Sequence, residues 1–191
     1  MNIERHPLVP FLPSHARWLF LGSFPPKQHR WSMDFYYPNF QNDMWRIFGL
    51  VFFQDRNHFV NTVEKTFRKE AIIAFLTKQG IAMYDTAEAV IRHKDNASDK
   101  NLEIAEPTNI GAFIHRLPHL QSIVTTGQKA SEAVIAYFAQ KGISINPPAV
   151  GAYTPFVYED RALCLYRMPS SSRAYPLALE KKAEIYRSLM S

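Results

Sequence analysis

Short apolar runs alternate along the chain with longer segments whose apolar residues recur every three to four positions. Aliphatic, aromatic and β-branched residues fill 18–21, 81–84 and 122–126, so each of these runs predicts a buried strand. Residues 153–158 and 161–167 predict the two strands of a hairpin. The pattern therefore indicates a protein that contains both strands and helices.

The longer segments predict helices with recognisable ends. Gly80 is a typical residue just beyond a helix, Pro118 stops a helix, and Asn42 is a good N-cap. Asp85 and Glu88 have the spacing of a capping box, so a further turn of helix is expected there. The expected helices cover 43–53, 60–79, 109–117, 128–141 and 177–189, and the polar residues 92–106 are expected to form turns.

Strands that alternate with helices at this spacing favour a parallel sheet covered by helices on both faces. In such sheets, the loops that leave the carboxyl ends of the strands form the binding crevice. Those loops begin at Gly22, Asp85, Gly127 and Met168. We therefore expect residues that carry chemistry near these four positions.

The composition is that of an ordinary globular protein. The 191 residues suffice for one domain with a full core, so we expect a single domain over 1–191. A formal net charge of +5 permits a polyanionic partner without showing one. No apolar run approaches the ~18–20 residues of a membrane span. Glu4 and Pro7 stand where a signal peptide has a basic region and an apolar core, so a cytoplasmic protein is expected. We also expect a monomer that does not contact the membrane.

Several familiar sites are missing from the sequence. It contains no G-x-x-x-x-G-K-[ST], no G-x-G-x-x-G and no G-x-S-x-G motif. Cys164 is the one cysteine, which excludes a disulfide framework, and its apolar surroundings indicate a core thiol. His115 and His119 have the spacing of a helical zinc pair, but Pro118 between them breaks that helix. No metal site is expected.

Three segments combine residue types that suit nucleobases or phosphates. Residues 22–26 (GSFPP) form a glycine turn stiffened by two prolines. Residues 36–45 (YYPNFQNDMW) concentrate aromatic rings, which stack on bases, and amides, which both donate and accept at a base edge. Residues 167–175 (RMPSSSRAY) place three hydroxyls between two arginines, which suits phosphate. The plainer interpretations are a strand-ending loop, a core-covering loop that caps a helix, and a serine-rich surface turn.

Together these segments resemble the uracil-DNA glycosylase superfamily, and they occur in the same order. The nearest pattern is that of the hypoxanthine-DNA glycosylases, followed by that of the mismatch-specific uracil glycosylases. Its motifs G-S-x-P-G and Y-Y-A-H-P-R-N-A-F-W align with 22–26 and 36–45 without a gap. The resemblance spans about 18–175. Its further matches are G-I-A-L-W-D at 80–85, a serine-aspartate pair at Ser98-Asp99, a strand–glycine–helix element at 126–130 and P-S-[ST]-S at 169–172.

The resemblance implies a three-layer αβα sandwich with a central, mainly parallel four-stranded sheet. It also implies hydrolysis, without a cofactor, of the N-glycosidic bond of a flipped-out deaminated base in DNA, such as uracil or hypoxanthine. Asn42 matches the catalytic asparagine, and Tyr37 matches the aromatic residue that stacks on the base. The other expected pocket residues are Gly22, Ser23, Phe24, Tyr36 and Asn39, and the expected DNA contacts are Ser170, Ser171, Ser172, Arg173, Gly127 and Lys129.

The sequence departs from the family pattern at three of these positions. Pro26 replaces the second glycine of the first motif, and Asn39 stands where the family has histidine. Phe24 occupies the position where other branches place a catalytic asparagine or aspartate, and a phenyl ring can neither orient water nor accept a proton.

Two alternatives therefore stay open. One is a non-catalytic module that binds damaged DNA on the same fold, and salt-dependent binding without base release would indicate it. The other is a nucleoside or small-molecule hydrolase that uses the same crevice, and release of a base from a nucleoside but not from DNA would indicate it.

Overall fold

The computed structural model describes residues 3–93 and 102–190, and its centre is a five-stranded sheet. The strands lie in the order β5 (Ile81–Asp85), β2 (Trp18–Gly22), β8 (Ser122–Thr126), β10 (Arg161–Met168) and β9 (Ala152–Tyr158). The first four are parallel, and β9 runs antiparallel to β10 at the edge. The sheet therefore has one strand more than the four expected, because both strands of the predicted hairpin belong to it.

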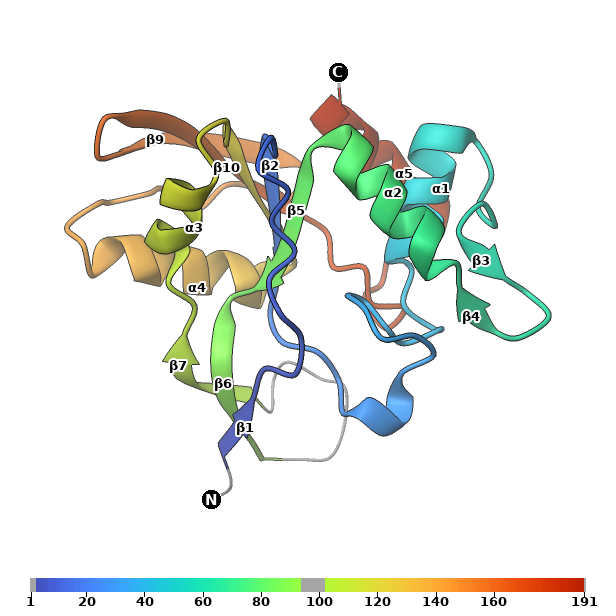
Figure 1. Cartoon of the computed structure of the whole chain (residues 1–191). Coiled ribbons are helices and arrows are strands. Elements are labelled where there is room, and N and C mark those ends of the chain that lie inside the picture. The colour runs from blue at the N-terminus through green and yellow to red at the C-terminus, as the bar shows by residue number, and fades with distance from the viewer. Residues whose placement is uncertain (1–2, 94–101, 191) are drawn as a thin grey trace.

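Helices cover both faces of this sheet (Figure 1). On one side lie α1 (Met44–Phe53), α2 (Lys69–Gln79) and α5 (Leu179–Arg187). On the other side lie α3 (Ile110–Arg116) and α4 (Gln128–Ala139). Short 3-10 turns, η1 (Gln28–Arg30) and η3 (Ser188–Met190), complete the helical elements named here. This is the layered arrangement that the alternation of strands and helices predicts.

A second sheet lies at the carboxyl end of β5, with the strand order β1 (Ile3–Arg5), β6 (Ala87–Arg92) and β7 (Leu102–Pro107). Strand β6 follows β5 almost directly and pairs antiparallel with both neighbours. The prediction of a helical turn at Asp85 and Glu88 is therefore wrong, because hydrogen bonds to strands on both sides hold the segment extended. This sheet ties residues 3–12, which we call the N-terminal arm, to the rest of the molecule.

Residues 60–79 do not form one helix. Helix α2 begins only at Lys69, after a short hairpin of β3 (Val60–Asn61) and β4 (Thr66–Phe67). The Asn61 side chain accepts hydrogen bonds from two backbone N–H groups that follow it, each over 3.2 Å. Such local bonds offer the backbone an alternative to a helix, which explains why the periodic pattern predicts the helix too early.

Trp45 on α1 connects the core to the loop that precedes the helix. Its indole is fully buried, and Nε1 donates to the carbonyl oxygen of Tyr36 over 3.0 Å. Phe48 packs edge to face against both Trp45 and Phe20, with ring centroids 5.6 and 5.5 Å apart. The core therefore anchors segment 36–45 from behind.

Two of the predicted helix ends are confirmed. Helix α2 stops at Gly80, which has a φ of 67°, and Asn109 caps α3 by accepting from the backbone N–H of Ala112 over 3.1 Å. Within 3–93 and 102–190, no helix combines the length and the apolar character needed to cross a bilayer. Ser98 and Asp99, the pair expected from the resemblance, lie outside the described residues.

Candidate functional site

A cavity of about 270 Å³ opens where β2, β5, β8 and β10 reach their carboxyl ends. This edge is where open parallel sheets bind ligands, and the volume is near the lower end of the ~300–1,000 Å³ range of ligand pockets. Its wall combines segments that are far apart in the sequence: residues 22–26, Arg30, residues 36–39, Gln41, Asn42, Asp85, Arg92, Leu102, Thr126 and residues 170–174.

The structure brings most of the predicted site residues together around this cavity. All of the expected pocket residues line it, as do Asn42, Arg173 and residues 170–172, which we call the serine turn. Gly127 and Lys129 do not line it. Gly127 lies directly behind Ser170, and the Lys129 ammonium donates to the carbonyl oxygen of Leu102 over 2.5 Å.

Gly22 ends β2 at the floor of the cavity, opposite Asp85 at the end of β5. A Cβ atom on Gly22 would collide with Oδ1 of Asp85 and would lie 3.3 Å from the hydroxyl of Tyr37. Any side chain at position 22 would therefore displace the carboxylate. The glycine permits this close approach of backbone and side chain.

Phe24 forms an apolar part of the cavity wall. Only 7% of the residue is exposed, and it packs with Ala87, Val90 and Leu102 from the second sheet. Its ring can contact the face or edge of a bound ring, but it supplies no hydrogen bond. The polar chemistry of the site must come from other residues.

The two tyrosines differ in their surroundings. Tyr36 is 3% exposed and donates its hydroxyl hydrogen to the carbonyl oxygen of Val9 in the N-terminal arm over 2.6 Å. Burial, reinforced by the charge of Asp85, raises the pKa of Tyr36 far above its usual range, so the phenol stays neutral. Tyr37 is half-buried, and its hydroxyl lies 2.8 Å from Oγ1 of Thr126.

The backbone of Tyr37 has a φ of 51°, in the left-handed region that L residues other than glycine, asparagine and aspartate rarely occupy. Such a conformation persists only where its surroundings hold it. Here Trp45 packs edge-on against the Tyr37 ring, with centroids 6.1 Å apart. The strain is therefore located at the cavity wall.

Asn42 combines a structural contact with a place in the cavity. The N-cap of α1 is Asp43 and not the predicted Asn42, but Oδ1 of Asn42 accepts from the backbone N–H of Met44 over 2.9 Å, at the start of the helix. Because the oxygen is engaged there, the amide nitrogen is the group that Asn42 can offer to a ligand as a donor. Asn39 uses its own Oδ1 to accept from the backbone N–H of Gln41 over 2.9 Å.

A buried ion pair joins segment 36–45 to the serine turn. Lys182 on α5 has no exposed surface, and its ammonium donates to Oδ2 of Asp43 over 3.1 Å and to the carbonyl oxygen of Ser172 over 2.8 Å. The backbone N–H of Asp43 donates to the carbonyl oxygen of Ser171 over 2.9 Å. Asn42 therefore keeps a fixed position relative to the serine turn.

The serine hydroxyls also stabilise the turn itself. Ser170 accepts from the backbone N–H of Ser172 over 3.2 Å, and Ser172 accepts from the backbone N–H of Ala174 over 3.3 Å. Ser171 is buried. These bonds are typical of turns built on short hydroxyl side chains, and they shape the rim of the cavity.

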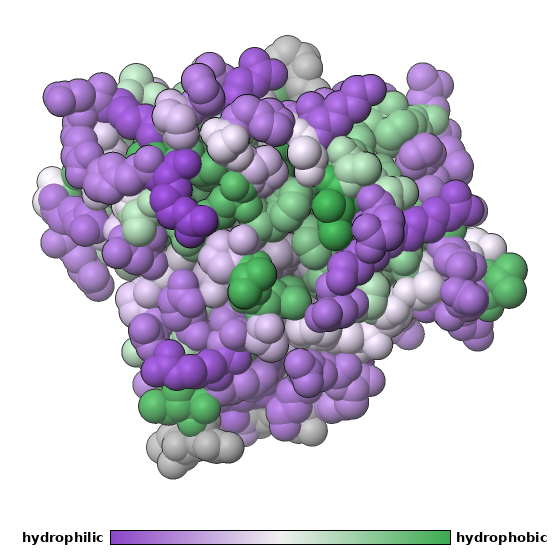
Figure 2. Space-filling view, viewed as in Figure 1, coloured by the Kyte–Doolittle hydropathy of each residue, from purple (hydrophilic) through white to green (hydrophobic). Residues whose placement is uncertain are grey.

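Cations lie around the cavity. Arg30 is exposed, and the side chain of Arg173 is 54% exposed although it also reaches Oδ1 of Asp43 over 3.4 Å. Arg92 is held inside by Glu4 over 2.9 Å and by the carbonyl oxygen of Pro25 over 3.0 Å. The face of the molecule in Figure 2 is mostly hydrophilic, with hydrophobic residues in its middle. The charges at the rim would attract an anionic ligand.

Lys182 and His6 were not predicted from the sequence to belong to the site, and Asp85 was predicted only as the start of a crevice loop. The Nε2 atom of His6 and the Oδ2 atom of Asp85 lie 2.8 Å apart. Asp85 lines the cavity, and His6 holds it from behind. Among the residues that the structure describes, no group of three or more histidine, cysteine, aspartate or glutamate side chains is placed to hold a metal ion.

The fold has a solved relative. A solution NMR structure from Methanosarcina acetivorans, named a "putative uracil DNA glycosylase", matches with a TM-score of 0.60 over 100% of both chains, at 20% sequence identity. No protein-family model and no curated protein sequence matches the chain. At this level of identity, the likeness establishes that the chain shares the α/β fold of that protein.

Proposed function

We propose that the chain is a DNA glycosylase that hydrolyses the N-glycosidic bond of a flipped-out deaminated base, such as uracil, hypoxanthine or a related lesion. The observation that carries this proposal is the cavity itself. Segment 36–45 and the serine turn lie more than a hundred positions apart in the sequence, and they border one hollow at the carboxyl edge of the sheet. The shared fold supports the same activity, which belongs to base excision repair.

The cavity wall suits an extruded base. Tyr37 and Phe24 supply ring surface for stacking, and Asn42 and Asp85 supply hydrogen-bonding groups for the base edge. Flipping a base out of the stack costs a few kcal/mol, and the cost is lowest for a mismatched or damaged base. The Ser170–Ser172 turn and Arg173 stand at the rim, where the flanking phosphates would pass.

The reaction proposed is hydrolysis without a cofactor. The bond between C1′ and the base nitrogen breaks, and its electron pair leaves with the base. A water oxygen bonds to C1′, and the water proton passes to solvent. The amide N–H of Asn42 donates to the departing base, where negative charge builds up.

The proposed enzyme is monofunctional. A lyase would need an amine close to C1′ to form a Schiff base. Among the described residues that line the cavity, none is a lysine. Lys182 lies behind the wall and is held by Asp43 and the backbone of Ser172.

Incubation with DNA that carries each lesion, followed by alkaline cleavage at abasic sites, tests the proposal. We expect at least one deaminated base to be released, and release from none of them would contradict it. Asn42→Ala should lower the rate by about a hundredfold, as loss of one preorganised donor does. Asn109→Ala removes another asparagine whose Oδ1 accepts from a backbone N–H at the start of a helix, here α3 and away from the cavity, and should leave the rate unchanged.

A non-catalytic module that binds damaged DNA is the second candidate. Phe24 favours it, because the ring lines the cavity where a polar side chain would be expected in an enzyme. Tight, salt-dependent binding to lesion-bearing DNA with no base release would indicate this function. Release of a base from free nucleosides, with none from DNA, would instead indicate a nucleoside hydrolase.

A further inference from the structure

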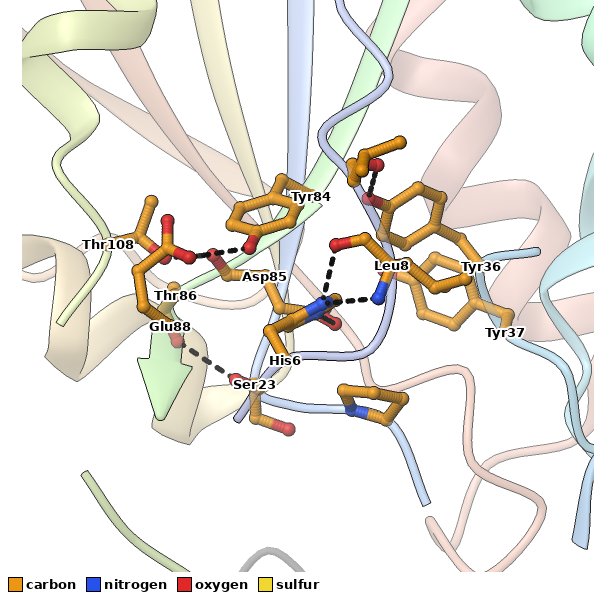
Figure 3. Close-up of polar contacts among 12 residues, drawn as sticks. His6, Leu8, Ser23, Tyr36, Tyr37, Tyr84, Asp85, Thr86, Glu88 and Thr108 are labelled. Carbon is orange, nitrogen blue, oxygen red and sulfur yellow. Dashed lines mark hydrogen bonds and ion pairs between the residues drawn. The ribbon is translucent and has the colours of Figure 1, made fainter. Parts of the chain in front are cut away.

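His6 belongs to the N-terminal arm and reaches under the cavity to Asp85 (Figure 3). Its Nε2 lies 2.8 Å from Oδ2 of Asp85, and the two side chains are 1% and 9% exposed. Neither the catalytic step nor the DNA contacts proposed above use this histidine. A buried polar pair of this kind needs an explanation, because both groups lose hydration on folding.

The surroundings of His6 fix the position of its ring. The ring packs against Tyr84 and Phe24, with centroids 4.5 and 5.1 Å away. Its backbone N–H donates to the carbonyl oxygen of Glu88 over 2.8 Å. The imidazole is therefore held between the first sheet and the second sheet.

The partner of Nε2 decides which nitrogen carries hydrogen, because a carboxylate oxygen can only accept. Nδ1 of His6 lies 3.1 Å from the backbone nitrogen of Leu8 and 3.0 Å from its carbonyl oxygen (Figure 3). The neutral ring can accept from that N–H, and the protonated ring can donate to that oxygen. In both forms Nε2 carries a hydrogen, so His6 donates to the carboxylate of Asp85.

Asp85 consequently presents one defined oxygen to a ligand. Oδ2 is occupied by His6, and Oδ1 lies beside Gly22, where the backbone leaves room for it. The residue lines the cavity on the wall that also carries Tyr37. A carboxylate is only an acceptor, so this oxygen can bind an N–H group but not a carbonyl oxygen or an unprotonated ring nitrogen.

We propose that Asp85, positioned by His6, determines specificity by selecting bases whose hydrogen-bonding edge presents a ring N–H to the cavity. The inference rests on the proposed function and deepens it. Uracil and hypoxanthine in their usual lactam forms carry such an N–H. A base that lacks it leaves Oδ1 of the buried carboxylate without a hydrogen bond from the ligand, and this loss is larger than the gain from one neutral contact.

Paired probes in which a methyl group replaces this one hydrogen test the assignment. Fluorescent duplexes carry uracil or N3-methyluracil, and hypoxanthine or N1-methylhypoxanthine, each on a 2′-fluoro sugar that slows hydrolysis. Fluorescence anisotropy then measures the dissociation constant of each complex. We expect the wild-type protein to bind the N–H form at least about tenfold more tightly in at least one pair, as for a hydrogen bond to a charged group.

Substitutions at the pair should remove this preference. In Asp85→Asn, His6 still donates to the amide oxygen, so the amide N–H₂ turns toward the cavity and faces the N–H of the base. The preference should then fall to within about threefold of unity. His6→Phe frees the carboxylate, so it should also reduce the preference for the N–H form. His6→Gln keeps a donor, so it should restore part of that preference.

Two matched variants control for general effects. Glu106→Gln removes an exposed carboxylate on β7, and His15→Phe removes an exposed histidine that lies outside the cavity. Both should keep the wild-type preference. Circular dichroism and thermal unfolding establish that each variant is folded. If Asp85→Asn does not fold, the affinities of the wild-type protein test the inference on their own. Equal affinity of the wild-type protein for methylated and unmethylated probes overturns it.

The outcomes separate this inference from the glycosylase proposal. If the wild-type protein releases bases but binds them equally with and without the ring N–H, the role of Asp85 is overturned and the glycosylase proposal stands. A protein that selects the N–H form without releasing any base would keep the role of Asp85 and overturn the enzyme. An Asp85→Asn variant with the full wild-type preference would also overturn the inference.

Discussion

The ammonium of Lys182 donates to the Asp43 carboxylate over 3.1 Å inside the protein, although helix α5 lies more than a hundred residues after Asp43 in the sequence. The pair joins the helix to the two loops that border the cavity. A buried ion pair is weak support for stability as such, but removal of one partner is costly, because the other charge stays behind in a low-dielectric environment. The pair therefore fixes positions within the site.

Lys182→Met tests this role. It removes the buried cation that Asp43 contacts and leaves the longer contact with the half-exposed Arg173, so the free energy of unfolding should fall by about 3 kcal/mol. Urea unfolding measures the change. Lys181→Met is the matched control, because Lys181 is exposed on the same helix and should cost less than about 0.5 kcal/mol. Equal stability of the two variants would contradict the role given to Lys182.

Gly22→Ala should disturb the cavity floor. The added Cβ meets Oδ1 of Asp85, so the carboxylate or strand β2 must shift, at a cost of about 1–3 kcal/mol. We expect weaker binding of lesion-bearing DNA, measured by fluorescence anisotropy. Gly142→Ala introduces strain at a φ of 78° but meets no atom within 4 Å, so it should lower stability without changing binding. Unchanged binding by Gly22→Ala would show that the floor tolerates a methyl group.

Stability should fall at alkaline pH. Burial raises the pKa of Tyr36, Tyr84 and Tyr186 above the value of 10.0 that these phenols have when exposed. Their contribution is fully present below pH 10 and is lost as the pH rises further, because the unfolded chain ionises there while the folded chain does not. Above pH 10, each of these tyrosines should lower the free energy of unfolding by about 1.4 kcal/mol per pH unit.

Urea unfolding between pH 9 and pH 11 measures this dependence. Tyr36→Phe should make it shallower, and it should also destabilise the protein by about 1 kcal/mol at neutral pH by removing the hydrogen bond to Val9. Tyr153→Phe, at a position that is 54% exposed, should leave the dependence unchanged. A Tyr36→Phe protein with the wild-type pH dependence would contradict the assignment.

Arg173→Ala tests the expected contact with the DNA backbone. Loss of one phosphate contact should weaken binding to all sequences alike and reduce the slope of log affinity against log salt by about 1. Titrations at several salt concentrations measure the slope. Arg116→Ala removes an exposed arginine at the end of α3, outside the cavity, and should leave the slope unchanged. The same slope for both variants would remove Arg173 from the interface.

The sequence predicts the central strands well because each is a short apolar run buried on both faces. Strands β2, β5 and β8 begin where the runs at 18, 81 and 122 begin, and each extends at most one residue further. The predictions at 60–67 and 85–92 fail for a different reason. At 60–67 the two short strands pair with each other in a hairpin, and at 87–92 strand β6 pairs with β1 and β7. Local periodicity reveals neither pairing.

The residues of the candidate site also divide into those that the sequence reveals and those that only the folded chain reveals. Segments 22–26 and 167–175 are visible because they concentrate unusual residues at strand ends, and segment 36–45 is visible because it concentrates aromatic and amide side chains. His6 and Lys182 are single residues in unremarkable surroundings, and only the folded chain shows what they contact. One signal was available for Lys182, since it stands among apolar positions of an amphipathic helix, beside Ala183 and Tyr186.

The N-terminal arm shows that the binding site is less robust than the domain that carries it. It is held by the three-residue strand β1, by the pairing of Phe11 with Met83 and by side chains at the edge of the core, whereas the central sheet is buried between helices. A segment at the edge of a structure opens at a lower free energy than the central strands do. Heating, or a single proteolytic cut near the first ten residues, would therefore remove His6 from the site. The protein would then no longer discriminate between bases with and without a ring N–H, although spectroscopy would still report a native fold.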